Sequence, residues 1–339
     1  MAVTIKDIAK VVGRSVTTVS RALGGYDDVS PETRKRVLQA AQELGYEPNI
    51  TARQLQKRRT DTIGLILPSF NPRFSDPFFS EFLTGVVEET TQRSFDLLVS
   101  TDVTTEDETS RYLKFIRSRR VDGFIVVRTQ RQDSRITLLK KHNYPFVAFG
   151  RVEGENDFPF IDEDGEQGIQ QIVNHLIELG HTRFACISEP TYLMKSYLRV
   201  QGFRKALAEH GLPIDESRII AGGFRQKSGQ QIGGQLLDLD DPPTAIVAVN
   251  DLLALGAMRA ARERGLVIGQ DVSITGFDDI VLAEYAHPPL TTVHQPARRI
   301  GTMLCRMLVK LINRESLDQK QVVLQPELIV RQSTGPRRR

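Results

Sequence analysis

The chain has 339 residues, of which 40% are hydrophobic and 26% charged, a composition typical of a globular protein with room for several domains. No apolar run approaches the roughly 20 residues of a membrane helix, and charged residues interrupt the first thirty positions, so we expect a cytoplasmic protein without a secretion signal. Cys186 and Cys305 form no metal-ligand pattern, which predicts buried free thiols and neither a metal nor a cofactor.

The charge is unevenly distributed along the chain. Residues 1–60 contain eleven Lys and Arg against six Asp and Glu, which leaves +5 there and −2 for the remainder of a total of +3. A small basic module joined to a weakly acidic body indicates a polyanion as partner.

Three short helices are predicted in the first 45 residues. The first begins at Thr4, where Asp7 completes a capping box. Ser15 caps the second, which runs from Val16 to Leu23, and Ser30 caps the third. Two short helices joined by a tight glycine-containing turn and braced by a third predict a helix-turn-helix unit.

The second of these helices is the candidate for reading DNA, because in such units its N-terminal residues meet base edges in the major groove. The candidate DNA-contacting residues are Thr4, Ser15, Val16, Thr17, Thr18, Ser20 and Arg21. Val16 offers an apolar surface to a thymine methyl group, and Arg21 can make a bidentate contact with guanine. Helical spacing alone leaves a three-helix bundle with an incidental polar face as an even alternative.

The segments TIKDIAKVVGRSVTTVSRAL, VSPETRKRVLQAAQELGYEPN and TARQLQ resemble the headpiece of the LacI/GalR family of bacterial transcription regulators. The resemblance runs through essentially the whole chain. It implies a sequence-specific repressor that binds near-palindromic operator DNA as a homodimer and responds to a small effector. The effector would release the operator by disordering a hinge that follows the headpiece.

The hinge is expected as a short helix from Ile50 to Gln56. In the family, two such helices from a dimer fold against each other in the minor groove. The hinge residues implied to contact DNA are Asn49, Ala52, Arg53 and Leu55, with Leu55 as an apolar wedge between base steps. A flexible linker is the alternative, because a helix this short is marginal in water.

From Thr62 onward, apolar strand-like segments such as TIGLILP, DGFIVV and TAIVAVN alternate with amphipathic helical segments. The alternation predicts two doubly wound parallel-sheet halves with a ligand cleft outside the carboxyl ends of the strands. The resemblance implies the same fold, a periplasmic-binding-protein-like α/β core. The expected divisions are a headpiece at 1–46, a hinge at 47–61, an N-terminal half at 62–163 with 293–322, a C-terminal half at 164–292 with 323–334, and a solvated basic tail at 335–339.

The segment QVVLQPELIVRQST reads as a strand, and the five residues that follow it here are too few for the apolar heptads of a tetramerising coiled coil. We therefore expect a dimer. No glycine-rich phosphate-binding loop, nucleophile elbow or HExxH zinc motif occurs in the sequence, so no enzymatic function is predicted.

The resemblance implies an effector site at ten positions: Ser69, Asp76, Phe78, Arg151, Asp162, Arg199, Phe224, Asn250, Asp278 and Gln295. Arg199 would donate to ligand hydroxyls or a carboxylate, Asp278 would accept from hydroxyls as an ionised carboxylate, and Phe224 would stack on a ring. Such groups around an aromatic surface suit a polyhydroxylated ring, which favours a mono- or oligosaccharide. A purine or another metabolite acting as corepressor is the alternative, and a solute-binding protein a distant one.

Structural roles compete with binding at several of these positions. Asp251 is expected to cap the helix DLLALGAMRA, Asp279 to be structural, and Phe78 and Phe79 could belong to the core. Asp278, like Arg199, is a stronger candidate for the ligand, because a charge at the end of an element in an apolar setting needs a partner.

Overall fold

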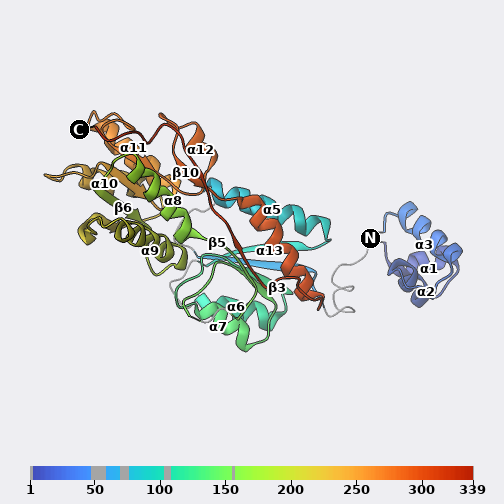
Figure 1. Ribbon diagram of the computed structural model, residues 1–339. Helices are drawn as coiled ribbons and strands as arrows, with labels where there is room; N and C mark the ends of the chain where they lie inside the picture. The colour runs from blue at the N-terminus through green and yellow to red at the C-terminus, as the bar shows by residue number, and fades with distance from the viewer. Residues whose placement is uncertain (1–2, 47–58, 69–75, 103–107, 155–156, 339) are drawn as a thin grey trace. The chain divides into compact units, whose positions relative to one another are not determined.

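The computed structural model describes residues 3–46, 59–68, 76–102, 108–154 and 157–338 (Figure 1). They belong to two compact units, Met1–Thr60 and Asp61–Arg339, and each unit is described by itself. None of the described helices is long and apolar enough to span a membrane. Cys186 and Cys305 are buried free thiols, as predicted, and burial raises the pKa of each to about 12.

The first unit is the predicted helix-turn-helix bundle, with helices α1 (Ile5–Val12), α2 (Val16–Leu23) and α3 (Pro31–Glu43). At the start of α1, the Asp7 carboxylate accepts from the backbone N and the Oγ1 of Thr4, at 2.9 and 2.7 Å. These bonds lower the pKa of Asp7. The three helices close a small apolar core, formed by Ile8, Ala9, Val12, Val19, Ala22, Val29, Val37, Ala40 and Ala41.

The second unit contains two parallel sheets, as predicted. The first has the strand order β11-β5-β4-β3-β1-β2. Its strands are β1 (Thr62–Pro68), β2 (Asp96–Asp102), β3 (Gly123–Val126), β4 (Phe146–Phe149), β5 (Phe160–Glu163) and β11 (Gln321–Leu324). Apolar residues from α5 (Pro77–Gln92) and α13 (Ala297–Ile312) pack on one face, and those of α6 (Glu108–Ser118) and α7 (Ser134–Lys141) on the other (Figure 1).

The second sheet has the strand order β7-β6-β8-β9. Its strands are β6 (Phe184–Ser188), β7 (Ile219–Ala221), β8 (Ala245–Ala248) and β9 (Ser273–Thr275). Its helices are α8 (Gly165–Glu178), α9 (Met194–Glu209), α10 (Gln226–Leu237), α11 (Asp251–Glu263) and the short α12 (Val281–Glu284), with a 3-10 turn at Glu216–Arg218. One continuous apolar core joins this sheet to its helices.

The chain crosses between the two halves after β5, after β10 (Thr292–His294) and after β11. The segment predicted as one strand, QVVLQPELIVRQST, is two strands. β11 pairs with β5 through Leu324, while β12 (Glu327–Ile329) pairs antiparallel with β10. The first sheet therefore extends two residues past the expected boundary at 322.

In the basic tail, Pro336, Arg337 and Arg338 are exposed, and the tail is also anchored. The backbone N of Arg337 donates to Leu179 O at 2.9 Å, and its guanidinium donates to Thr182 Oγ1 at 2.7 Å. Upstream of it, the buried Ser333 hydroxyl donates to Ile274 O at 2.6 Å. These contacts hold residues 333–337 against the second half.

Candidate functional site

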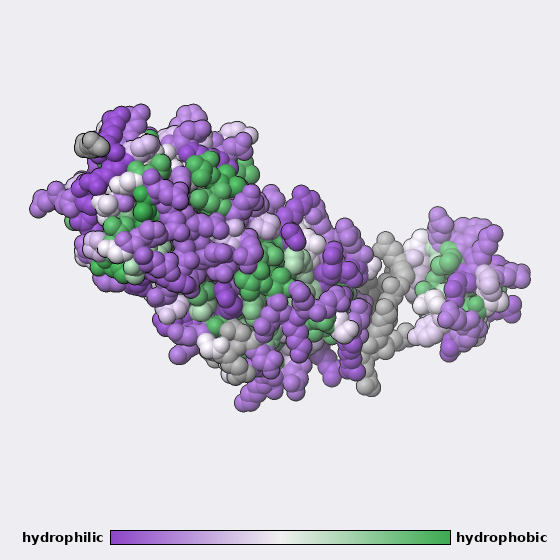
Figure 2. Space-filling view, viewed as in Figure 1, coloured by the Kyte–Doolittle hydropathy of each residue, from purple (hydrophilic) through white to green (hydrophobic). Residues whose placement is uncertain are grey.

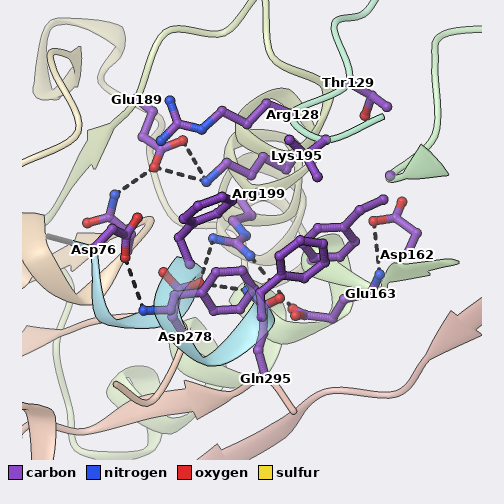
Figure 3. Close-up of a pocket in the computed structure, with 18 of the residues that line it drawn as sticks. Asp76, Arg128, Thr129, Asp162, Glu163, Glu189, Lys195, Arg199, Asp278 and Gln295 are labelled. Atoms are coloured by element: carbon purple, nitrogen blue, oxygen red, sulfur yellow. Dashed lines mark hydrogen bonds and ion pairs between the residues drawn. The ribbon is translucent and has the colours of Figure 1, made fainter. Parts of the chain in front are cut away.

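A pocket lies between the two halves of the second unit, at the carboxyl ends of the strands (Figure 3). The first half lines it with Asp76, Phe78, Phe79, Phe82, Val127, Arg128, Thr129, Phe149, Gly150, Asp162 and Glu163. The second half and the crossings add Gly165, Glu189, Lys195, Leu198, Arg199, Asn250, Leu252, Asp278 and Gln295. Both parallel sheets place the residues that follow their strands at this edge, which is where ligands bind in such folds.

Seven of the ten predicted effector positions lie in this pocket: Asp76, Phe78, Asp162, Arg199, Asn250, Asp278 and Gln295. Arg151 is not in its lining, but its Nε donates to Asp162 Oδ2 at 2.6 Å and supports that carboxylate from behind. Phe224 is also outside the lining, and its ring centroid lies 4.5 Å from the guanidinium carbon of Arg128. Ser69 lies outside the described residues, as do the hinge positions Asn49, Ala52, Arg53 and Leu55.

Asp278 follows β9 in a backbone conformation that is unusual for an L-residue. Its φ is +115°, and that of Asp279 is +52°. Asp278 Oδ1 accepts from Gln295 Nε2 at 2.6 Å and from an Arg199 Nη1 at 3.4 Å. Burial raises the pKa of Asp278 to about 7, although Arg199 lowers it. Burial therefore opposes the ionised form of Asp278 that the sequence analysis expects.

This pKa predicts a pH-dependent stability. The pKa of Asp278 is raised to about 7 from an ordinary 3.8, so its stabilising contribution is present below pH 4 and is lost as the pH rises through 7. Between pH 5 and 7, we expect the free energy of unfolding to fall by about 2 kcal/mol more in the wild type than in Asp278→Asn. Urea titrations of both proteins across this range measure the difference, and parallel profiles would contradict it.

Arg199 projects from α9 into the centre of the pocket. Its Nη1 donates to Val249 O at 2.6 Å, and its Nη2 lies 3.9 Å from Glu163 Oε1. The guanidinium carbon lies 3.6 Å from the ring centroid of Phe277. The Arg199 Nε is buried and has no hydrogen-bond partner among the described residues. The guanidinium thus lies among four neighbours, Val249, Glu163, Phe277 and Asp278, and its Nε has no acceptor among the described residues.

Glu163 is a pocket residue that the sequence analysis missed. It ends β5 directly after Asp162, and its side chain is almost fully buried. Neither carboxyl oxygen has a hydrogen-bond partner among the described residues. Burial raises the pKa of Glu163 well above its ordinary value, and the charges of Asp278 and Asp162 raise it further. The signal in the sequence was the run of acidic residues after the strand FPFI.

Glu189, at the end of β6, anchors a second polar cluster that was also missed. Its carboxylate accepts from Lys195 Nζ at 2.8 and 3.0 Å, from Asn250 Nδ2 at 2.6 Å and from Ser196 Oγ at 3.0 Å. Burial alone would raise the pKa of Glu189, but Lys195 and Arg128 outweigh it and lower the pKa to about 2. Figure 3 shows Glu189, Lys195 and Arg128 together on one side of Arg199.

The expected helix cap at Asp251 is wrong, because Asn250 caps α11. Asn250 Oδ1 accepts from Leu253 N at 2.7 Å. Asp251 is fully buried as the first residue of the helix and accepts from Thr292 Oγ1 at 2.6 Å and Ile280 N at 2.8 Å. Asp251 therefore ties α11 to the loop after β9 and to β10, a role that needs contacts distant in sequence.

Asp279 is structural, as predicted. Its carboxylate accepts from an Arg331 nitrogen at 2.8 Å, and His294 Nδ1 lies 3.0 Å from it. Adjacent carboxylates in the sequence thus serve different purposes, since the side chain of Asp278 lines the pocket and that of Asp279 holds the β10 and β12 region together.

An aromatic wall completes the pocket. The ring of Phe149 lies 6.0 Å from Phe78 and 5.9 Å from Phe82, with interplanar angles of 17° and 13°. Phe79 is a buried core residue, Phe78 is half-buried and packs against the same core, and both line the pocket. The wall gives a ligand one flat apolar surface beside the buried polar groups.

In the first unit, the start of α2 presents an exposed face. Val16 is 41% exposed, and Thr17 and Arg21 are also exposed, whereas Ser15 is engaged in capping α2 by accepting from Thr18 N at 3.1 Å. Arg21 Nε donates to Asp28 Oδ1 at 2.9 Å, and the guanidinium lies 5.1 Å from the Tyr26 ring. Because exposed ion pairs of this kind contribute only about 0–1 kcal/mol, Arg21 can exchange Asp28 for another acceptor at little cost.

Comparisons with known proteins agree with both units. Residues 4–49 match the profile of bacterial regulatory proteins of the lacI family, and residues 173–334 match a periplasmic binding protein-like domain. The chain is 37% identical to the HTH-type transcriptional regulator AglR of Rhizobium meliloti (strain 1021), over 99% of this chain and 95% of AglR.

Two solved structures are similar over the same extent. The complex of transcriptional regulator CelR with cellobiose has 34% identity and a TM-score of 0.75, covering 98% of this chain and 99% of CelR. The lac repressor dimer bound to operator and the anti-inducer ONPF has 30% identity and a TM-score of 0.86, covering 98% of this chain and 99% of the repressor chain.

Proposed function

Because the chain belongs to the LacI family of bacterial regulatory proteins, we propose that it represses transcription from operator DNA until a sugar occupies the pocket of the second unit. It is a DNA-binding transcription regulator. Its regulated genes would be those for taking up or degrading the sugar.

One observation carries the sugar assignment, namely the flat aromatic wall facing buried hydrogen-bonding groups. Rings such as Phe78 and Phe149 suit the apolar face of a sugar ring. Arg199 and Asp278, which line the same pocket, suit hydroxyl groups, each of which can both donate and accept. The similar CelR structure contains cellobiose, a molecule with these features.

The position of the pocket supports a coupling between ligand and DNA. Its lining comes from both halves, and the chain crosses between them beside it. A ligand that contacts both halves stabilises one arrangement of the two and shifts the population towards it. If operator binding favours the other arrangement, ligand and operator weaken each other by the same factor.

A homodimer is part of the proposal. Val281, Leu282 and Tyr285 are 62%, 44% and 71% exposed on and beside α12, and Val87 on α5 is 44% exposed. Figure 2 shows apolar surface over α12 and in the region of α5 and α13. A second copy would cover such a surface, and the similar lac repressor structure is a dimer bound to operator.

The proposal is tested in two steps with the full chain. Selection from random duplexes should yield a near-palindromic operator, and thermal melting against a panel of sugars and purines should identify a ligand. The ligand should then weaken operator binding. A purine that raises the melting temperature and tightens operator binding would favour the corepressor alternative, and a chain that selects no DNA sequence would refute the function.

Arg21→Ala should weaken operator binding and relax the base preference at one position per half-site. A bidentate Arg–guanine contact discriminates against the wrong base by about 1–3 kcal/mol. The measurement is a set of fluorescence anisotropy titrations against the operator and its single-base variants. A loss that is equal for every sequence, with a smaller salt dependence, would mean that Arg21 contacts phosphate instead.

Asp28→Ala is the matched control for this prediction, because it removes the exposed partner of Arg21 and keeps the arginine. It should leave the operator preference intact and the affinity unchanged or slightly higher. A loss of affinity equal to that of Arg21→Ala would show that the pair holds the headpiece together.

A further inference from the structure

The charged groups of the pocket bear on which sugars it accepts. We propose that the pocket takes an uncharged polyhydroxy ligand and rejects phosphorylated and carboxylated ones, and that Glu163 is the residue that sets this selection. The inference rests on the proposed function and narrows the ligand class of the same site.

The cations of the pocket are already engaged by protein groups. Lys195 Nζ lies 2.8 and 3.0 Å from the two oxygens of Glu189. Arg199 donates to Val249 O at 2.6 Å and lies 3.4 Å from Asp278 Oδ1, and Arg128 lies over the Phe224 ring. Strong anion sites supply ionised donors aimed at the ligand. Here an anion would have to compete with Glu189 for Lys195 and with Asp278 for Arg199 Nη1.

Two of the helices that begin at the pocket, α5 and α11, have N-termini capped by a side chain, whereas α9 has no side-chain cap. At α5, Asp76 Oδ1 accepts from Phe78 N at 3.1 Å, so a carboxyl group already occupies the end that would attract an anion. At α11, Asn250 Oδ1 accepts from Leu253 N at 2.7 Å. The backbone nitrogens of Phe78 and Leu253 are therefore already engaged and would not donate to a phosphate.

Carboxyl groups outnumber cations around the cavity. Asp76, Asp162, Glu163, Glu189 and Asp278 line it, against Arg128, Lys195 and Arg199. Burial raises the pKa of Asp76 and of Asp162, as it does for Glu163 and Asp278. The same burial that disfavours the ionised form of these carboxyl groups would disfavour a buried anionic ligand.

The polar atoms without a partner indicate which hydrogen-bonding groups a matching ligand has. Among the described residues, both Glu163 oxygens and Gln295 Oε1 are buried without a hydrogen-bond partner, and so is the donor Arg199 Nε. Because its pKa is raised, Glu163 offers both an O–H donor and an acceptor oxygen, so the matching ligand must both donate and accept hydrogen bonds. Hydroxyl groups do both, whereas a phosphate or carboxylate ionised at neutral pH has few or no protons to donate.

Glu163, at the end of β5 in the pocket lining, is the residue we expect to distinguish neutral from anionic ligands. Its nearest cationic atom in an ion pair, Arg199 Nη2, is 3.9 Å away, too far for a hydrogen bond. Glu163→Gln keeps the shape of the side chain, leaves it only one acceptor oxygen and removes its capacity to ionise. It should weaken the binding of a hydroxyl-donating ligand and strengthen the binding of an anionic one. Both effects reduce the ratio of the affinity for the neutral ligand to that for the anionic ligand.

The test uses neutral sugars and their anionic counterparts on the full chain: cellobiose with cellobionate, maltose with maltobionate, and glucose with glucose 6-phosphate. Isothermal titration calorimetry should give, for each neutral sugar that binds, an affinity at least 100-fold above that of its counterpart. Glu163→Gln should narrow that ratio at least tenfold. Glu178→Gln, which removes an exposed carboxylate on α8, should leave the ratio unchanged.

An anionic counterpart that binds as tightly as its neutral sugar would overturn the inference, as would an unchanged ratio in a folded Glu163→Gln variant. Either result leaves the proposed function standing, provided that the bound sugar still weakens operator binding. Failure of every probe to bind would count against both the inference and the proposed function. If a neutral sugar binds but does not change the affinity for the operator, that result would contradict the proposed function alone.

Discussion

Asp278→Ala is expected to bind operator as the wild type does and to lose its response to the sugar. Asp278 lies at the centre of the pocket network, with Gln295 Nε2 at 2.6 Å and Arg199 Nη1 at 3.4 Å from its Oδ1. A charge-assisted hydrogen bond contributes roughly 1.5–3 kcal/mol. If Asp278 accepts two such bonds from ligand hydroxyls, their loss should lower ligand affinity by about two to four decades, at 1.4 kcal/mol per tenfold. The headpiece belongs to a separate unit and should read DNA as before.

Operator titrations with and without the sugar, together with a melting curve, measure this outcome. The φ of +115° at Asp278 strains alanine as well, so Asp278→Asn serves as the control, because asparagine tolerates positive φ better. Both variants should lose the response. Normal release of the operator by either variant would remove Asp278 from the site, and a response lost only in an unstable Asp278→Ala would assign it a structural role.

Arg199→Ala should have the largest effect on stability. The guanidinium is the only cationic group that the described residues place within 4 Å of both Glu163 and Asp278. Removing one partner of a buried ion pair costs about 3–5 kcal/mol, and here the loss comes either from an uncompensated carboxylate or from the free energy of protonating it. The side chain also donates to Val249 O, which would lose that bond.

Urea unfolding at pH 7 should show this loss directly. A second substitution, Glu163→Gln, should recover part of it in the double variant, because it removes one of the two carboxyl groups left unpaired. A loss below about 1 kcal/mol would contradict the account, since a typical substitution at an uncoupled site costs no more. An additive double variant would show that Glu163 and Arg199 do not interact.

The sequence predicts most of the fold because its strands are buried on both faces. The runs TIGLILP and TAIVAVN contain the strands β1 and β8. The helix α10, QKSGQQIGGQLL, was not predicted, and its three glycines explain why. These glycines allow α10 to pack closely against α11, since a Cβ on Gly229 would lie 2.1 Å from Leu253 O. That requirement comes from a partner helix and cannot be read from the local pattern.

The site was predictable where it depends on position along one strand. Asp278 and Asn250 follow β9 and β8, and parallel sheets bring such residues to one edge. Glu163, Glu189 and Lys195 were missed because their importance comes from pairing. Lys195 matters through its distance to Glu189, and Glu163 through its lack of a hydrogen-bond partner. Neither the Lys195–Glu189 distance nor the missing partner of Glu163 can be predicted from the spacing of residues in the sequence.

The central claim is that a ligand bound in the pocket lowers the affinity of the first unit for operator DNA. The direct measurement is a fluorescence anisotropy titration of the full-length wild type against its selected operator, with and without the sugar that raises its melting temperature. At saturating sugar, the Kd for the operator should rise at least tenfold, and saturating operator should weaken sugar binding by the same factor. An operator Kd that does not change at saturating sugar would contradict the account.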